Sequence, residues 1–172
     1  AYTYLFFPLM TLLRSIFWRI PIQQAKITPH VSLIIAAYNE AQSIAAKIDN
    51  SLALDYPREK LEIIIASDGS TDGTDEIVRS YANQGIRLLS LARRGKAPTL
   101  NAAVDTANGE ILVFSDANSM YAPDAILSLV RPFADAQVGG VAGNQIYLKD
   151  EHNQTTSAGE NGYWNFDRKL KK

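Results

Sequence analysis

Residues 31–40, which read VSLIIAAYNE, decide the fold of this chain. The first seven of them form a continuous apolar run of strand length, as expected for a β-strand that helices cover on both faces. The run ends at the polar residues Tyr38, Asn39 and Glu40. Outward from it, short β-branched runs alternate with segments of helical period. This alternation predicts an α/β fold, with a mostly parallel sheet and helices on both faces.

Further strands are expected over residues 61–66, 86–91, 111–114 and 138–147. Helices are expected between them, because apolar residues recur there at three- and four-residue spacing. The helix after the second strand has Ser70, Thr71 and Asp72 as candidate N-caps. The next helix carries residues 100–107, and Pro123 starts a last one.

The N-terminal segment differs from the rest, because residues 4–20 are nearly all apolar or aromatic. A membrane-spanning helix needs roughly 20 apolar residues, and this run is shorter and contains Arg14. The basic residues Arg14, Arg19 and Lys26 lie toward its C-terminal side, which places the following domain in the cytoplasm. We therefore expect residues 1–20 to be a hydrophobic helix on the inner or plasma membrane. An interfacial amphipathic helix and a helix buried in the domain are the alternatives.

Composition bounds the possible functions. With 172 residues, 47% of them hydrophobic, the chain is long enough for one domain with a sizeable core. Its net charge of -1 lacks the basic excess that nucleic-acid binding requires, so nucleic acid is excluded as an expected partner. The chain has no cysteine, and its histidines are His30 and His152. A catalytic triad of serine, histidine and aspartate is therefore disfavoured.

Three polar clusters follow predicted strands, at residues 38–40, 67–70 and 115–118. Each cluster by itself could be an ordinary turn or helix cap, since Asp, Asn, Ser and Gly favour such positions. In an open parallel sheet, however, ligands bind at the carboxyl ends of the strands. The three clusters together therefore predict one polar cleft.

The chemistry of this cleft favours a nucleoside diphosphate. Asp68 and Glu40 could accept hydrogen bonds from a base or ribose, and Lys96 offers a cation to phosphate. Asp116 and its neighbours offer hard oxygen ligands, which suit Mg²⁺ or Mn²⁺. The first strand is not followed by G-x-G-x-x-G, and no Walker-type motif is present, so a dinucleotide fold and a P-loop are disfavoured.

Four ordered motifs also carry a resemblance to a known family. They read VSLIIAAYNE at 31–40, SDGSTDGT at 67–74, GKAPTLN at 95–101 and SDANS at 115–119. Over residues 31–143, the chain resembles family 2 glycosyltransferases with the GT-A fold, a Rossmann-like α/β fold. The resemblance implies inverting transfer of a sugar from a nucleotide sugar, usually a UDP-sugar, to an acceptor hydroxyl.

The motif matches also imply a set of site residues. The nucleoside would be held by Ala37, Tyr38, Glu40 and Asp68. Lys96 would lie near the diphosphate, and Asp116 with Asn118 would stand where the family has its metal-binding Asp-x-Asp, for Mg²⁺ or Mn²⁺. Asp116 would thereby contribute to nucleotide-sugar binding as well. Asn118 replaces the more usual aspartate, which keeps an oxygen ligand and removes one negative charge, so metal binding should depend more on the diphosphate.

The same resemblance bears on the ends of the chain. The hydrophobic lead-in and the region of Glu160, Tyr163 and Trp164 are similar to membrane-bound synthases of extracellular polysaccharides. The expected segments are then a membrane helix at 1–20, a linker at 21–30, a nucleotide-sugar-binding domain at 31–149 and the start of an acceptor-side region at 150–172. The family's general base, and its Gln-x-x-Arg-Trp segment, lie beyond the last motif.

The late carboxylates do not replace that base. Asp150, Glu151 and Glu160 lack its sequence context, so the chain is expected to be an N-terminal fragment without an assigned catalytic base. The expected function is a glycosyltransferase acting on a saccharide or lipid-linked acceptor. A nucleotidyltransferase that makes nucleotide sugars, and a non-catalytic nucleotide-sugar-binding module, are the alternatives.

Overall fold

The computed structural model describes residues 2–17 and 21–144 of the chain. The chain divides into two compact units. One unit, Gln23–Val141, contains the sheet and its helices, and the other includes the N-terminal helix.

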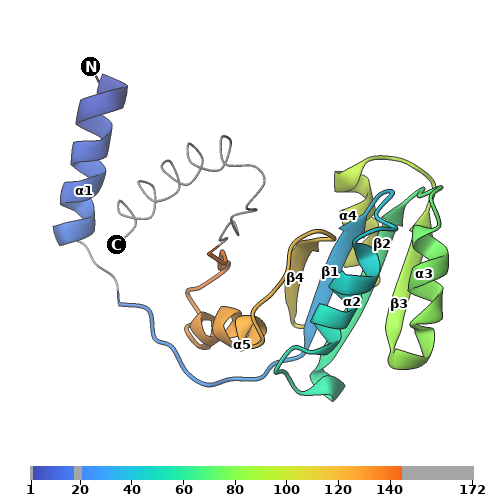
Figure 1. The fold of residues 1–172 in the computed structure, drawn as a ribbon. Helices are drawn as coiled ribbons and strands as arrows, with labels where there is room; N and C mark the ends of the chain where they lie inside the picture. The colour runs from blue at the N-terminus through green and yellow to red at the C-terminus, as the bar shows by residue number, and fades with distance from the viewer. Residues whose placement is uncertain (1, 18–20, 145–172) are drawn as a thin grey trace, which may run out of the picture. The chain divides into compact units, whose positions relative to one another are not determined.

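The sheet unit is built on four strands that are paired in parallel throughout (Figure 1). They are β1 (Val31–Ala37), β2 (Leu61–Asp68), β3 (Ile86–Leu91) and β4 (Ile111–Asp116). Their order is β3-β2-β1-β4, so the chain steps outward from β1 to β3 and then returns to the other side of β1. The reversal places a topological switch point between β1 and β4, where open parallel sheets bind ligands.

Helices cover both faces of this sheet, as predicted. They are α2 (Ile44–Leu52), α3 (Thr74–Ser80), α4 (Lys96–Val104) and α5 (Ala125–Val130). Short 3-10 turns lie at Arg58–Lys60, Ala82–Gln84 and Arg131–Ala134. One hydrophobic cluster joins Leu33 and Ile35 of β1 to α2, α3 and α5, and a second joins Ile34 to α4. Because successive strand residues point to opposite faces, a strand covered on both is mostly apolar, which explains the run in β1. The polar residue within it, Ser32, is buried and donates a hydrogen bond to Glu62.

Three local predictions need correction. The helix after β2 has Gly73 as its N-cap; Asp72 accepts hydrogen bonds from the backbone N–H and hydroxyl of Thr74 in a turn just outside it. Helix α4 spans Lys96–Val104, so it ends before Ala107, the last of the apolar positions predicted to lie in it. Residues 138–144 are not a strand, while 145–147 lie outside the described residues. A strand requires a hydrogen-bonded neighbour, and local apolarity at 138–144 did not supply one.

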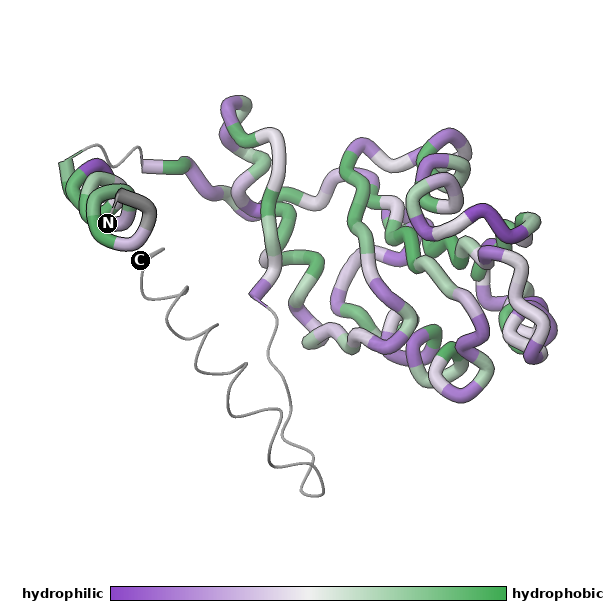
Figure 2. Tube along the Cα trace, turned by 90° about the horizontal axis from the view of Figure 1, so that it is seen from above, coloured by the Kyte–Doolittle hydropathy of each residue, from purple (hydrophilic) through white to green (hydrophobic). Residues whose placement is uncertain are grey.

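The N-terminal unit includes a π-helical turn, Tyr2–Phe6, that continues into α1, Phe7–Phe17. Hydrophobic residues line most of this helix (Figure 2). Its exposed apolar side chains include Leu5, Leu9, Met10, Leu13, Ile16 and Phe17. Among the described residues, no helix is both long enough and apolar enough to cross a membrane.

A polar network fastens the loop before β4 to the sheet. The Glu62 carboxylate on β2 accepts hydrogen bonds from the Ser32 hydroxyl at 2.6 Å and from the backbone and side chain of Asn108, both at 3.0 Å. Arg87 on β3 forms an ion pair with Glu62 and donates to the Thr106 carbonyl oxygen at 2.7 Å. Burial by itself would raise the pKa of Glu62, but the hydrogen bonds from Ser32 and Asn108 and the Arg87 charge hold that pKa below its usual value.

Replacement of Glu62 by glutamine should test this network. Glu62→Gln keeps the shape but loses the charge, so the free energy of unfolding near pH 7 should fall by about 1–3 kcal/mol in urea denaturation. Because the folded-state pKa is depressed, the stabilisation is complete above the usual value of 4.5 and is lost as the pH falls below it. The difference between the two proteins should therefore shrink in acid.

Glu59→Gln is the matched control, because Glu59 is exposed in the turn three residues earlier and should change the stability little. A stability difference for Glu62→Gln that stays constant down to pH 3 would show that the carboxylate charge is not its source.

Candidate functional site

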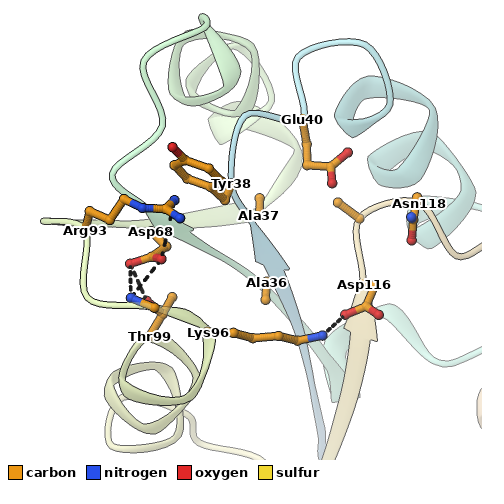
Figure 3. A pocket seen from close by; sticks show the side chains of 12 residues that line it. Ala36, Ala37, Tyr38, Glu40, Asp68, Arg93, Lys96, Thr99, Asp116 and Asn118 are labelled. Carbon is orange, nitrogen blue, oxygen red and sulfur yellow. Dashed lines mark hydrogen bonds and ion pairs between the residues drawn. The ribbon is translucent and has the colours of Figure 1, made fainter.

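A cavity of about 420 Å³ opens at the carboxyl ends of the strands, across the switch point (Figure 3). Residues from the ends of β1, β2 and β4 and from the loop between β3 and α4 form its walls. The lining residues are Ala36, Ala37, Tyr38, Glu40, Asp68, Arg93, Gly95, Lys96, Thr99, Asp116, Ala117 and Asn118. The small side chains at 36, 37 and 117 leave the space that the polar groups surround.

The loop after β1 is fixed by the loop after β2. Asn39 has a left-handed backbone with φ 53°, a conformation that asparagine tolerates better than most residues. Its side-chain oxygen accepts from the Thr71 N–H at 2.9 Å, and its own N–H donates to the Ser70 hydroxyl at 3.1 Å. The Glu40 N–H donates to the Thr74 hydroxyl at 2.9 Å. These contacts hold the backbone that carries Tyr38 and Glu40 at the cavity.

Asp68, the last residue of β2, is almost completely buried. Its Oδ1 accepts from the Arg94 N–H at 2.7 Å and from the Thr99 hydroxyl at 3.0 Å, and its Oδ2 accepts from the Gly95 N–H at 3.0 Å. The hydrogen bond from the Arg94 N–H outweighs burial and, with the other donors, lowers the pKa of Asp68. Asp68 is therefore an ionised carboxylate that also anchors the loop between β3 and α4.

That loop brings a guanidinium group to Tyr38. The Arg93 Cζ atom lies 3.2 Å from the centroid of the Tyr38 ring, and its Nη1 lies 3.9 Å from Asp68 Oδ2. A cation over an aromatic face is attracted by the ring quadrupole. The Tyr38 residue remains 43% exposed, so it still presents surface at the rim of the cavity.

Lys96 and Asp116 meet on the opposite side of the cavity. The Lys96 Nζ donates to Asp116 Oδ1 at 2.5 Å, and the two side chains are 63% and 54% exposed. Asn118 is also exposed. Across the described ranges 2–17 and 21–144, no group of three or more histidine, cysteine or carboxylate side chains could hold a metal ion. A cation bound at Asp116 and Asn118 would thus need further ligands from water or from a bound molecule.

All seven residues predicted from the sequence line this one cavity: Ala37, Tyr38, Glu40, Asp68, Lys96, Asp116 and Asn118. Sequence reasoning missed Arg93 and Thr99. Both follow β3, so a search of the carboxyl end of that strand, as was made for the other three, would have found them. Asp150, Glu151 and Glu160 lie outside the described residues.

Comparison with known proteins identifies the family of the chain. Residues 32–172 match the model of the family described as glycosyl transferase family 2. The chain is 33% identical over 117 residues to poly-beta-1,6-N-acetyl-D-glucosamine synthase of Staphylococcus epidermidis, covering 66% of this chain and 28% of that protein. It is 36% identical over 118 residues to beta-monoglucosyldiacylglycerol synthase of Nostoc sp., covering 66% of this chain and 25% of the relative. The chain thus spans about a quarter of the length of these curated relatives.

Two solved structures extend the comparison. The mannosyltransferase PcManGT from Pyrobaculum calidifontis, in complex with GDP-Man and Mn²⁺, superposes with a TM-score of 0.70 at 37% identity. That match covers 80% of this chain and 43% of PcManGT. Staphylococcus aureus TarS in complex with UDP-GlcNAc gives a TM-score of 0.54 at 26% identity, covering 57% of this chain and 30% of the TarS chain. These likenesses confirm the predicted GT-A-like fold.

At Gly69, the loop after β2 closely approaches the loop between β3 and α4. A matched pair of substitutions can test this approach. Gly69 and Gly73 both have left-handed backbones, with φ values of 69° and 94°. A Cβ atom on Gly69 would lie 2.7 Å from the Arg93 backbone nitrogen, whereas one on Gly73 would meet nothing within 4 Å. Gly73→Ala should cost about 1 kcal/mol of stability through backbone strain, and Gly69→Ala at least about 1 kcal/mol more through displacement of the Arg93 loop.

Thermal or urea denaturation of the two variants measures this difference directly. Equal losses of stability would mean that the two loops do not pack as closely as described.

Proposed function

The chain belongs to glycosyl transferase family 2, and on that premise we propose that the cavity of the sheet unit binds the donor of a sugar-transfer reaction, with a UDP-sugar as the donor. The observation that carries the proposal is the convergence of Asp68, Lys96 and Asp116, from β2, α4 and β4, on one cavity at the switch point. A nucleotide sugar needs hydrogen-bond acceptors for its nucleoside and cationic groups for its diphosphate, and the cavity offers Asp68 and Glu40 as acceptors and Lys96 as a cation.

The nucleoside occupies the side formed by Ala37, Tyr38, Glu40 and Asp68. The buried Asp68 carboxylate is held ionised and in a fixed orientation, so it can accept a hydrogen bond from a base without an added cost of ordering. Tyr38 offers an aromatic surface for stacking. PcManGT was solved with GDP-Man and TarS with UDP-GlcNAc, so the choice of uracil for this chain is the finer part of the proposal.

The diphosphate occupies the side formed by Lys96, Asp116 and Asn118. Lys96 begins helix α4, so its ammonium group and the first N–H groups of the helix both favour an anion there. The exposed oxygens of Asp116 and Asn118 fit a hard divalent cation such as Mg²⁺ or Mn²⁺. Since they form no cluster of three ligands, the donor set fits a cation that the diphosphate helps to bind.

The reaction proposed for the whole protein is inverting transfer. The acceptor hydroxyl attacks the anomeric carbon, its proton passes to a base, and the bond to the diphosphate oxygen breaks. The bound cation would supply charge stabilisation for the leaving diphosphate. Lys96 adds a second positive charge on the same side. In the described part of the chain, Asp68 accepts hydrogen bonds from three donors and forms an ion pair with Arg93, and Asp116 pairs with Lys96, so neither of these carboxylates is assigned as the base.

The acceptor is proposed to be a saccharide or a lipid-linked molecule, in the synthesis of a polysaccharide or glycolipid. The names of the two relatives support these two classes, one being a polysaccharide synthase and the other a glycolipid synthase. The nucleotidyltransferase alternative loses its support, because the chain belongs to a glycosyltransferase family. This chain supplies the donor side.

Calorimetry with UDP in the presence of Mn²⁺ tests the donor site. Asp68→Ala removes a buried acceptor and the anchor of the Arg93 loop, so it should weaken UDP binding by about tenfold or more. Asp116→Asn should remove most of the Mn²⁺-dependent part of the affinity and leave the metal-free part nearly unchanged.

Asp105→Asn is the control, because Asp105 is an exposed aspartate at the far end of α4. Unchanged affinity in both the Asp68 and the Asp116 variants would contradict the site. A preference for GDP over UDP would retain the donor site and overturn the choice of nucleotide.

We also propose that residues 1–20 attach the protein to the cytoplasmic side of the inner or plasma membrane. The exposed apolar side chains along α1, with Arg14, Arg19 and Lys26 toward its C-terminal side, support the proposal. Apolar side chains of this kind gain free energy by entering the acyl region of a bilayer, and basic residues are attracted to anionic lipid headgroups.

Sedimentation with liposomes that contain anionic lipid tests this attachment. The whole chain should bind and resist extraction at high salt, whereas a chain that begins at Ile27 should remain in the supernatant. The double substitution Leu9→Ser with Leu13→Ser should reduce binding at unchanged length, because both side chains are exposed. Equal sedimentation of all three proteins would rule out the anchor.

A further inference from the structure

Helix α2 buries a lysine against the segment that follows β4. Lys47 has 0% exposure and is among the largest completely buried side chains in the described part of the chain. Lysine is almost never fully buried unless it has a partner, because removal of an ammonium group from water is costly. A surface helix with an apolar inner face would be expected to place leucine or isoleucine here, as it does at Ile44 and Ile48. The position of Lys47 therefore needs a specific explanation.

The ammonium group of Lys47 contacts one segment, residues 117–121. Its ammonium group donates a hydrogen bond to the Ser119 carbonyl oxygen and lies 4.2 Å from the centroid of the Tyr121 ring. Burial lowers the pKa of Lys47 to about 8, while the negative charge of Asp116 opposes that shift. Lys47 is thus still mostly charged at neutral pH.

The side chain of Asn50, one turn further along α2, bonds to the backbone of the same segment. Its side-chain nitrogen donates to the Tyr121 carbonyl oxygen at 2.9 Å, and its side-chain oxygen accepts from the Tyr121 N–H at 2.9 Å. The pair of bonds resembles one rung of a β-ladder. Ser119 is in turn tied to the end of β4, because its N–H donates to the Asp116 carbonyl oxygen at 3.2 Å.

Residues 117–121 contain Asn118, and Asp116 directly precedes them. The helix thus fixes the backbone at 119 and 121, on the far side of Asn118 from β4. The side chains at 116 and 118 are themselves exposed at the cavity, so their spacing depends on the backbone between them. A segment held only at Asp116 could place Asn118 in many orientations.

We propose that Lys47 and Asn50 are positioning residues that lock residues 117–121 in the conformation in which Asp116 and Asn118 can share a divalent cation with the donor diphosphate. This role rests on the proposed donor site. Lys47 also contributes a fixed buried positive charge near Asp116, so a free divalent cation binds less readily there than one that brings the negative charge of a diphosphate. The dependence on diphosphate that Asn118 implies is thereby increased.

Amide hydrogen exchange of the unliganded whole chain is the first test. Lys47→Met keeps the length of the side chain and removes its charge and hydrogen bond, so exchange at residues 119–121 should accelerate by about five- to tenfold relative to the strands. Asn50→Ala should have the same effect, centred on the Tyr121 N–H. Asn50 is only half-buried, so this second variant retains the fold if Lys47→Met does not.

Titration with UDP, with and without Mn²⁺, is the second test. In Lys47→Met and Asn50→Ala, the ratio of the Kd without Mn²⁺ to the Kd with Mn²⁺ should fall by about tenfold, while metal-free UDP affinity stays within about twofold of the wild type. Ser51→Ala is the matched control, because the buried Ser51 hydroxyl donates only to the Lys47 carbonyl oxygen within the same helix. It should change neither the exchange rates at 119–121 nor the Mn²⁺ ratio.

The outcomes separate this inference from the proposed function. If the wild type shows Mn²⁺-dependent UDP binding and both variants keep the same ratio and exchange rates, the positioning role is wrong. A general loss of stability with an unchanged Mn²⁺ ratio also overturns it, since that result describes only a structural role. If the wild type binds no nucleoside diphosphate, the donor site is wrong and the metal-positioning role is wrong with it. This holds even if faster exchange in the variants shows that Lys47 and Asn50 hold the segment.

Discussion

The hydrogen bonds accepted by the Asp68 carboxylate are the constraint on which the arrangement of the cavity depends. Asp68 ends β2 in the centre of the sheet, and it accepts from two backbone N–H groups and one hydroxyl of the segment that opens α4. These bonds fix the start of α4, and with it Lys96. They also place Arg93 where its guanidinium lies over Tyr38. One buried ionised group thus determines the positions of groups on both sides of the cavity, and its low pKa is the electrostatic consequence of those same bonds.

Two carboxylates at the cavity each lie near a basic side chain in the ligand-free molecule. Arg93 lies near Asp68, and Lys96 bonds to Asp116. The two pairs differ in their surroundings, since Asp68 is buried while Lys96 and Asp116 are more than half exposed. The exposed pair is the one that an incoming ligand can rearrange at low cost, because solvent-exposed ion pairs contribute little free energy. In the other pair Asp68 is buried and belongs to the permanent structure of the site, although the Arg93 side chain is exposed.

The sequence predicted the four observed strands and the two-sided helical cover, because strands buried on both faces leave long apolar runs that need no tertiary information to identify. The rule that ligands bind at the carboxyl ends of strands then brought together all seven proposed site residues. Lys47 escaped notice for a physical reason: in sequence, a lysine within an amphipathic helix looks like part of its solvated face, and only tertiary packing buries it. The predicted strand at 138–147 was wrong over residues 138–144, because pairing depends on a neighbour that local hydrophobicity does not specify.

The in-register ends of the strands mark the boundary between the packed interior of the sheet unit and the rim that is proposed to bind the ligand. Ala36 of β1 lies opposite Ala66 of β2 and Asp116 of β4, so the three strands reach the cavity at one level. Beneath that level the side chains of β1 and β2 are almost completely enclosed, and a change there disturbs the packing of both faces. At and above it, the side chains of Tyr38, Arg93 and Asn118 are exposed and lie outside the two hydrophobic clusters. In such a scaffold, substitutions at the rim can change which ligand binds while the interior folds as before.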